Sequence, residues 1–181
     1  MPVVFNYYHR LSAVNKRIYV ASDKVEQLLL PDALPLRPLV NDLAGALQAD
    51  KRVQVETICN ALAAGMNARF GIPPVVIKVL SKRPSDDYGE LHGLYEGVEG
   101  RIKVAKITLW MRTAQRKQVV AFKSFLRTFL HEMCHHLDYE HFKFADSFHT
   151  EGFYKRESSL FHQLVAPPEP GKSFDAPGPA L

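Results

Sequence analysis

The sequence predicts an α+β fold, with N-terminal helices, then a small mixed β-sheet, then a helix rich in histidine and a last C-terminal helix. Three observations support this order. Apolar residues recur at helical spacing up to residue 70, short β-branched runs with glycines follow between residues 75 and 112, and the helical period returns from about residue 117. Helices and strands thus occupy separate parts of the chain, which is typical of α+β domains.

The first part of the chain is expected to be mostly helical. Ser22 and Asp23 would cap a helix that Pro31 ends, and the proline-rich segment 31–38 is expected to lack regular structure. Gly71 would end the last of these helices, which carries an apolar stripe. In order, the expected elements are a short strand at 17–20 and helices at 22–30, 39–49 and 51–69.

The second part of the chain is expected to contain the sheet and the two helices that follow it. A β-branched run, a glycine-rich stretch and a partly alternating run predict strands. In order, the expected elements are strands at 75–80, 88–98 and 101–112 and helices at 117–141 and 153–164. Residues 166–181 contain five prolines and are expected to be disordered, so a single domain is predicted at 1–165.

The composition of the chain argues against several classes of protein. No apolar run reaches the ~20 residues of a membrane-spanning helix, and the N-terminus lacks the apolar core of a secretory signal. A cytoplasmic protein without a membrane association is therefore expected. Cys59 and Cys134 lie far apart without CxxC partners, which argues against a disulfide framework or a zinc ribbon. The net charge of +4 is spread along the chain and permits only weak attraction to nucleic acid.

Five of the eight histidines lie between residues 131 and 149, and two of them form the motif HExxH with Glu132. A helix turns ~100° per residue, so His131 and His135 lie ~40° apart on one face and can bind the same metal ion. Glu132 lies ~60° from His135, where its carboxylate can hold a zinc-bound water and take its proton. These residues predict the active-site helix of a zincin.

A solvated helix face is the alternative interpretation of this segment. Such a face usually carries Lys and Glu, whereas the polar residues here are Ser124, Thr128, His131, His135 and Tyr139. The opposite side is apolar, with Phe122, Phe125, Leu126, Phe129, Met133 and Leu137. A buried helix that presents histidines on its polar face favours a metal site over a solvated surface.

Catalytic zinc usually has three protein ligands and one open position, so a third ligand is expected outside the motif. His136 points toward the core side and is expected to be hydrogen-bonded and partly buried. His141 gives nearly the metzincin spacing, although no methionine follows to form the Met-turn of that family. Glu157 on the last helix would give a gluzincin-like site, and His149 is the third candidate. Glu151 and Glu157 are otherwise expected to be surface charges.

Residues 149–153 (HTEGF) resemble the HGxxF element that follows HExxH in SprT-like zinc metallopeptidases. The motif resemblance covers about residues 125–155, and the order of helices and strands is similar over about residues 40–165. In that family the histidine of HGxxF is the third zinc ligand, which implies this role for His149. Thr150 stands where the family has glycine. The family often carries a C-terminal zinc ribbon, which this chain is expected to lack, and this argues against a DNA-directed role, although nucleic acid stays a weakly supported partner.

The resulting functional prediction is a zinc metalloendopeptidase that hydrolyses peptide bonds in a protein or peptide substrate. His131, His135 and His149 are expected to hold Zn²⁺, and Glu132 to act as general base toward the zinc-bound water and then as proton donor to the leaving amine. The alternatives are a gluzincin-like peptidase with Glu157 as third ligand and a non-catalytic protein whose structural zinc is closed by additional histidines.

Two further expectations concern the walls of the cleft. In zincins the strand before the active helix forms the upper edge of the cleft and pairs with extended substrate, which implies this role for residues 101–112. Trp110 at the end of that strand is expected either to line the cleft or to anchor the core. Tyr139, Tyr154 and Arg156 are the candidates for a second donor to the transition-state oxygen.

Overall fold

The structure is a computed structural model, and it describes residues 4–82, 84–86, 89–90, 92–100, 102–114 and 116–165. The proline-rich tail predicted at 166–181 lies outside these residues.

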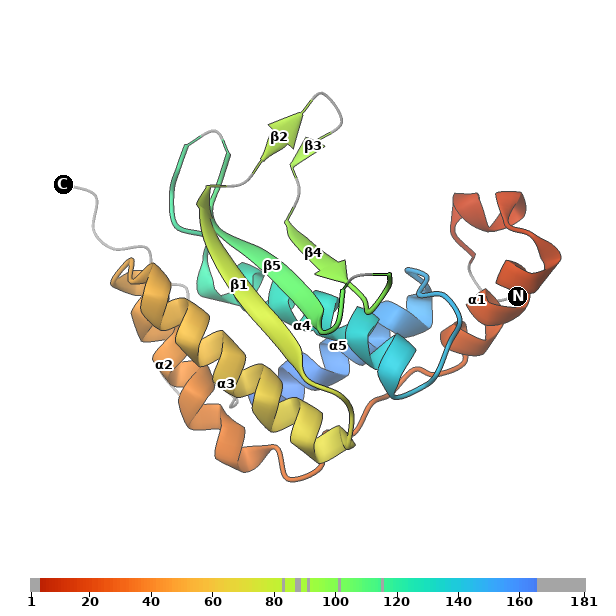
Figure 1. Cartoon of the computed structure of the whole chain (residues 1–181), viewed down its shortest axis with the longest axis horizontal. Coiled ribbons are helices and arrows are strands. Elements are labelled where there is room, and N and C mark those ends of the chain that lie inside the picture. The colour runs from red at the N-terminus through yellow and green to blue at the C-terminus, as the bar shows by residue number, and fades with distance from the viewer. Residues whose placement is uncertain are drawn as a thin grey trace, which may run out of the picture.

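The described residues contain five α-helices and a small three-stranded mixed sheet, so the predicted α+β class is confirmed (Figure 1). The helices are α1 (Ala13–Asp23), α2 (Arg37–Gln48), α3 (Arg52–Phe70), α4 (Phe122–Glu140) and α5 (Glu151–Leu164). The strands are β1 (Val75–Lys82), β2 (Ser85–Asp86), β3 (Gly89–Glu90), β4 (Gly93–Glu96) and β5 (Ala105–Arg112). Two short 3₁₀ helices, η1 (Asn6–Arg10) and η2 (Leu34–Leu36), precede α1 and α2.

The main sheet has the strand order β1-β5-β4, and β2 pairs only with β3. β1 runs parallel to β5, with Val75 opposite Ala105, whereas β4 runs antiparallel to β5, with Gly93 opposite Leu109. β5 is therefore the central strand and has no free edge. The prediction that this strand forms the edge of the cleft is wrong, because the antiparallel strand β4 occupies the side nearest α4.

The core lies between the sheet and the helices. α4 packs against β4 and β5, α5 packs on α4, and α3 lies along β1 and against α2. The apolar side of α4 is buried as predicted, with Phe129 and Met133 fully inaccessible. Trp110 is also buried, so it anchors the interior and does not line a cleft. This packing holds the histidine-bearing face of α4 opposite β4.

The first 30 residues differ from the prediction. Residues 17–20, expected as a strand, lie within α1, and Ser22 lies near the end of that helix and does not begin one. Residues 17–20 (RIYV) are helical because Tyr19 is buried among the aromatic rings of Tyr7, Tyr8 and Phe148. The actual cap is Ser12, whose Oγ accepts a hydrogen bond from the Asn15 N–H.

Residues 31–38 also contain more regular structure than expected. η2 lies inside this segment, and α2 begins at Arg37 with Pro38 in its first turn. A proline in that position is compatible with a helix because the first-turn N–H groups have no intrahelical acceptor. The helices predicted at 39–49 and 51–69 correspond to α2 and α3, and the later strands and helices agree with β1, β4, β5, α4 and α5 to within a few residues.

Candidate metal centre

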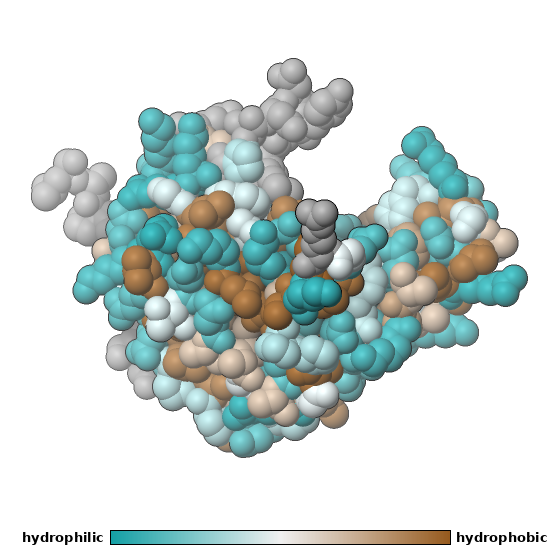
Figure 2. All heavy atoms as spheres, in the orientation of Figure 1, coloured by the Kyte–Doolittle hydropathy of each residue, from teal (hydrophilic) through white to brown (hydrophobic). Residues whose placement is uncertain are grey.

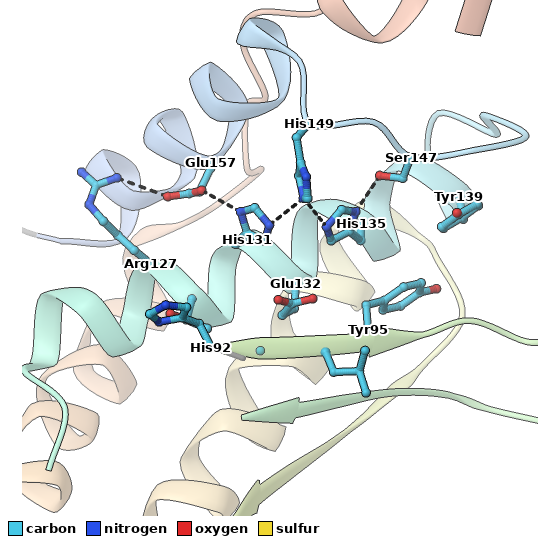
Figure 3. Close-up of a pocket in the computed structure, with 13 residues that line it drawn as sticks. His92, Tyr95, Arg127, His131, Glu132, His135, Tyr139, Ser147, His149 and Glu157 are labelled. Atoms are coloured by element: carbon cyan, nitrogen blue, oxygen red, sulfur yellow. Dashed lines mark hydrogen bonds and ion pairs between the residues drawn. The ribbon is translucent and has the colours of Figure 1, made fainter. Parts of the chain in front are cut away.

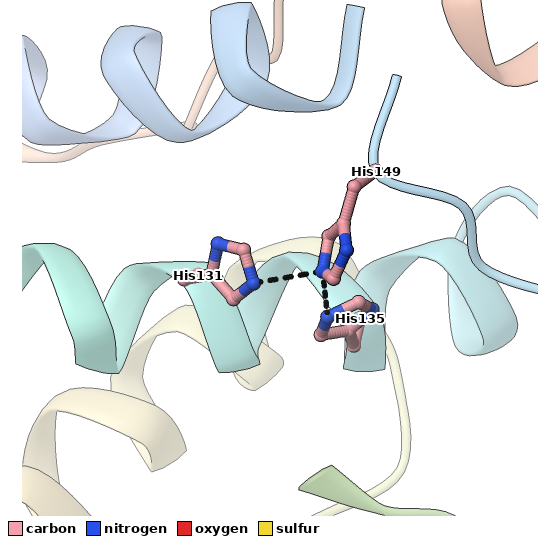
Figure 4. A group of neighbouring side chains, drawn as sticks. All are labelled: His131, His135 and His149. Atoms are coloured by element: carbon pink, nitrogen blue, oxygen red, sulfur yellow. Dashed lines mark hydrogen bonds between the residues drawn. The ribbon is translucent and has the colours of Figure 1, made fainter. Parts of the chain in front are cut away.

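Three histidine side chains converge on one point between α4 and the loop that leads to α5 (Figure 4). The Nε2 atom of His149 lies 2.9 Å from Nε2 of His131 and 3.0 Å from Nε2 of His135. Nitrogen ligands around one tetrahedral zinc ion are about 3.3 Å apart, so the cluster is close to the size that zinc requires. The three rings, with ligand atoms all within 4.8 Å of one another, could hold a metal ion.

The outer nitrogens of the two helix histidines make hydrogen bonds that orient the rings. Nδ1 of His131 lies 3.2 Å from Oε2 of Glu157, and Nδ1 of His135 lies 2.7 Å from Oγ of Ser147. When Nδ1–H donates to these oxygens, the Nε2 lone pairs of both rings face the centre. His149 can donate a single proton to only one of them, so the centre is rich in lone pairs and suits a cation.

Burial favours the neutral form of His135 and His149, which is the form that can bind a metal. Burial, together with the neighbouring His131 and His149, lowers the pKa of His135 to about 3. The pKa of His149 is also lowered, chiefly by burial and then by His131.

The start of α5 and the N-terminal segment hold His149 in place. Its backbone carbonyl accepts a 2.7 Å hydrogen bond from the hydroxyl of Tyr7, and its ring stacks on Tyr154. Thr150 is the N-cap of α5, because its Oγ1 accepts from the N–H of Phe153 at 2.9 Å. A hydroxyl side chain at position 150, where the SprT-like pattern has glycine, thus has a capping role in this chain.

Gly152 allows the first turn of α5 to pack directly against the end of α1. A Cβ at this position would lie 2.3 Å from the carbonyl oxygen of Asp23, which no side chain tolerates. The Gly152 N–H also donates to Oδ1 of Asp23 at 3.0 Å. This close approach sets the position of the loop that carries His149.

Glu132 lies between α4 and β4, beside the histidines (Figure 3). It is 6% exposed, and a Cβ on Gly93 would lie 2.5 Å from its Oε1. Burial raises the pKa of Glu132 to about 7, although His131 and the backbone N–H of Tyr95 partly oppose the shift. A carboxyl group with this pKa can accept and release a proton near neutral pH.

The other candidate residues lie in different environments. His136 is fully buried and contacts the hydroxyl of Tyr95 and the carbonyl of Pro73, as expected for a hydrogen-bonded core histidine. His141 packs on Phe70 and is not part of the three-histidine cluster.

The two glutamates of α5 differ from each other. Glu151 forms a surface pair with Lys155, as predicted. Glu157 is 8% exposed, so its interpretation as a surface charge is wrong. It contacts the outer nitrogen of His131 and also pairs with Arg127 at 3.4 Å, which makes it a partner of a candidate ligand.

A cavity of about 620 Å³ opens over this cluster. Figure 2 shows a notch between the body of the domain and the N-terminal unit formed by η1 and α1, but none of the residues that line the cavity comes from that unit. The lining residues are His92, Gly93, Leu94, Tyr95, Arg127, Thr128, His131, Glu132, His135, Tyr139, Ser147, His149 and Glu157. Of the three predicted oxygen-binding donors, only Tyr139 lines the cavity, and Arg156 is buried against Asp138.

Sequence patterns did not single out several of the site residues. Ser147, Gly93 and Tyr95 come from a loop and a short strand without motif character, and only the fold brings them to α4. Asp138 stands where the metzincin spacing has glycine, and it also lies about one helical turn from His135 on the same side of α4.

Comparison of the chain with protein-family models, curated proteins and solved structures found no match. Among the described residues, no helix is long and apolar enough to cross a membrane.

Proposed function

We propose that this chain is a zinc-dependent metallopeptidase of the SprT-like zincin type, with His131, His135 and His149 as ligands. The observation that carries the proposal is the convergence of three imidazole Nε2 atoms beside the buried carboxyl group of Glu132. The nearest alternative third ligand, Glu157, contacts the outer nitrogen of His131 and therefore fits the role of a supporting acceptor better.

Zinc held by three imidazoles would supply a Lewis acid that polarises a carbonyl group and makes water more acidic. Glu132 would take a proton from the attacking water and later give it to the leaving amine. Burial raises the pKa of this carboxyl group to about 7 in the metal-free protein, and a bound cation would lower it toward the ionised form that accepts a proton. The enclosed position between α4 and β4 keeps the carboxyl group beside the ligands.

The edge strand β4 would bind the substrate. The N–H of Tyr95 points at Glu132, and hydrogen-bonding directions alternate along an antiparallel strand, so Gly93 and Tyr95 share the outer edge. An extended peptide can pair with such an edge through its main chain. The cavity provides space for side chains on both sides of the cluster, with Arg127 toward one end and Tyr139 toward the other.

Metal stoichiometry tests the ligand set. Elemental analysis should find one zinc per chain in the wild type and in His141→Ala, and none in His131→Ala or His149→Ala. Glu157→Ala should retain the metal with weaker affinity. Loss of zinc from His141→Ala, or full retention in His149→Ala, would reject this ligand set.

Peptide hydrolysis tests the reaction. The zinc-loaded protein should cleave casein, whereas Glu132→Gln should bind zinc normally and lose at least ~100-fold in rate. Cleavage should not require DNA. A zinc-loaded protein without activity on casein or on a peptide library would contradict the peptidase assignment and favour a structural zinc.

A further inference from the structure

We propose that Ser147 and Asp138 are positioning residues that hold His135 in the tautomer with the proton on Nδ1. The inference rests on the proposed metal centre, because this tautomer directs the Nε2 lone pair at the other two histidines. It assigns a role to two side chains outside the HExxH motif and the proposed ligand set.

The direction of the hydrogen bonds follows from the chemistry of the three groups. Ser147 Oγ donates to Oδ2 of Asp138 at 2.8 Å. A hydroxyl group has one proton, so once it donates to the carboxylate its oxygen can only accept from His135. The 2.7 Å contact between Ser147 Oγ and His135 Nδ1 is therefore a bond in which Nδ1–H donates.

Asp138 keeps its acceptor role because a buried arginine holds it. Arg156 Nη2 donates to Oδ1 of Asp138 at 2.9 Å, and the two side chains are 1% and 0% exposed. Arg156 also donates to the carbonyls of Ser22 and Val25, each at 2.7 Å, and to Oγ of Ser22. The guanidinium can only donate hydrogen bonds. Oδ1 of Asp138 therefore accepts from Arg156, and Oδ2 accepts from Ser147.

The other two histidines are oriented by different means. The outer nitrogen of His131 meets the carboxylate of Glu157 directly, and that carboxylate also pairs with Arg127, which is 42% exposed. The position of His149 depends on its backbone carbonyl and on ring stacking. Of the three histidines, only His135 has a hydroxyl group as its partner, and a hydroxyl can rotate between donating and accepting. The direction of this hydrogen bond can therefore be tested.

Two substitutions should have effects of different size. Ser147→Ala removes the acceptor and leaves Nδ1 to water. Asp138→Asn keeps the shape but must present its carbonyl to Arg156, so its amide N–H donates to Ser147 Oγ. The hydroxyl then donates to Nδ1 of His135, and the ring proton moves to Nε2, where it blocks the metal. Removing the hydroxyl from that variant should therefore improve metal binding.

The experiment measures two properties of the purified full chain. ¹⁵N NMR of the metal-free protein should show His135 protonated on Nδ1 in the wild type and on Nε2 in Asp138→Asn. Zinc affinity, from competition with a chelator well below the unfolding temperature of each variant, should fall ~10-fold in Ser147→Ala and ~100-fold in Asp138→Asn. The double variant should recover to the Ser147→Ala value.

Ser159→Ala is the matched control, because it removes a hydroxyl on α5 that donates to the carbonyl of Leu28, away from the cavity. It should leave zinc affinity unchanged. An unchanged His135 tautomer in Asp138→Asn, or a double variant that binds zinc no better than Asp138→Asn, would overturn the inference. A wild type that shows the predicted tautomer but binds no zinc would instead refute the proposed function.

Discussion

The two edges of the main sheet, β1 and β4, differ in how far side chains occupy their outward-facing backbone groups. Along β1, side chains from α3 occupy the backbone groups that face outward. Asn60 bonds both the N–H and the carbonyl of Ile77, Glu56 accepts from the N–H of Val79, and Arg52 donates to the Val79 carbonyl. Along β4, the described residues show one such contact, between the Tyr95 N–H and the carboxyl group of Glu132 on α4.

The contrast indicates which edge is available to an added strand. Unpaired strand edges attract other chains, and proteins usually cover them. Three polar side chains at four-residue spacing along α3 close the β1 edge. The β4 edge borders the cavity with the three histidines, where a peptide could pair with it.

The two edges also place a glutamate in similar geometry with opposite electrostatics. Glu56 has Lys78 at 3.3 Å and Arg52 at 3.7 Å. Burial raises its pKa, but the Val79 N–H and these cations outweigh that effect, so the pKa of Glu56 is lowered. The pKa of Glu132 is raised mainly because the group is buried. One carboxylate therefore supports the fold, and the other is suited to proton transfer.

Crowding Glu132 from β4 should have the largest effect. Gly93→Ala would place a Cβ 2.5 Å from Oε1 of Glu132 and displace the carboxyl group. We expect peptide cleavage to fall ~100-fold, with zinc retained, because small displacements of catalytic groups are costly. Gly97→Ala is the matched control, since its Cβ would meet the Tyr95 ring at an ordinary 3.5 Å. Equal activity in the two variants would contradict the role of Gly93.

Replacing Glu132 with a neutral residue should stabilise the metal-free protein at alkaline pH. Its folded-state pKa of about 7 lies above the ordinary 4.5, so the stability it contributes is present below pH 4.5 and is lost as the pH rises through 7. Urea unfolding should show Glu132→Gln more stable than wild type at pH 8 by up to about 3 kcal/mol, with the difference closing near pH 4. A difference that does not depend on pH would contradict the raised pKa.

Opening the closed edge should lower stability without altering catalysis. Asn60→Ala removes both hydrogen bonds to Ile77 and should reduce the free energy of unfolding by about 1–3 kcal/mol. Chemical denaturation measures this loss, and light scattering should show more association through the exposed β1 edge. Unaltered casein cleavage at a temperature where the variant is folded is the internal control.

The smallest effect is expected for Glu56→Gln. Because its folded-state pKa is lowered, the stability that Glu56 contributes is present above the unfolded pKa and is lost as the pH falls through the folded pKa. We expect a loss of less than about 1 kcal/mol at pH 7 for this partly exposed pair, disappearing below about pH 4. This change in the free energy of unfolding has the opposite sign to that expected for Glu132→Gln. Changes of the same sign in both variants would contradict the contrast between the two glutamates.

The sequence predicted the parts of the site that depend on one helix. His131, Glu132 and His135 have spacings that α4 alone determines, and the structure brings the two rings together. The placement of His149 beside them agrees with what the SprT-like resemblance implied. The sequence could not show that β4 would lie outside β5, because strand order in a sheet need not follow chain order.

The remaining support of the site depends on contacts between distant segments. Ser147 meets Asp138 only through the path of the 141–150 loop, and Arg156 reaches α1 across more than a hundred residues. The prediction for residues 17–20 failed for the same reason, since burial of Tyr19 against distant aromatic rings overrode local β propensity.

The hydrogen bond from Tyr7 to the His149 carbonyl joins residues 142 positions apart. The first helix must therefore dock on the last one before the third histidine is held in place. During synthesis, a chain that has emerged only as far as the end of α4 would present His131 and His135 without the third histidine, and two ligands bind zinc more weakly than three. Metal loading would then follow completion of the fold, and zinc uptake during refolding would report the docking of the chain's two ends.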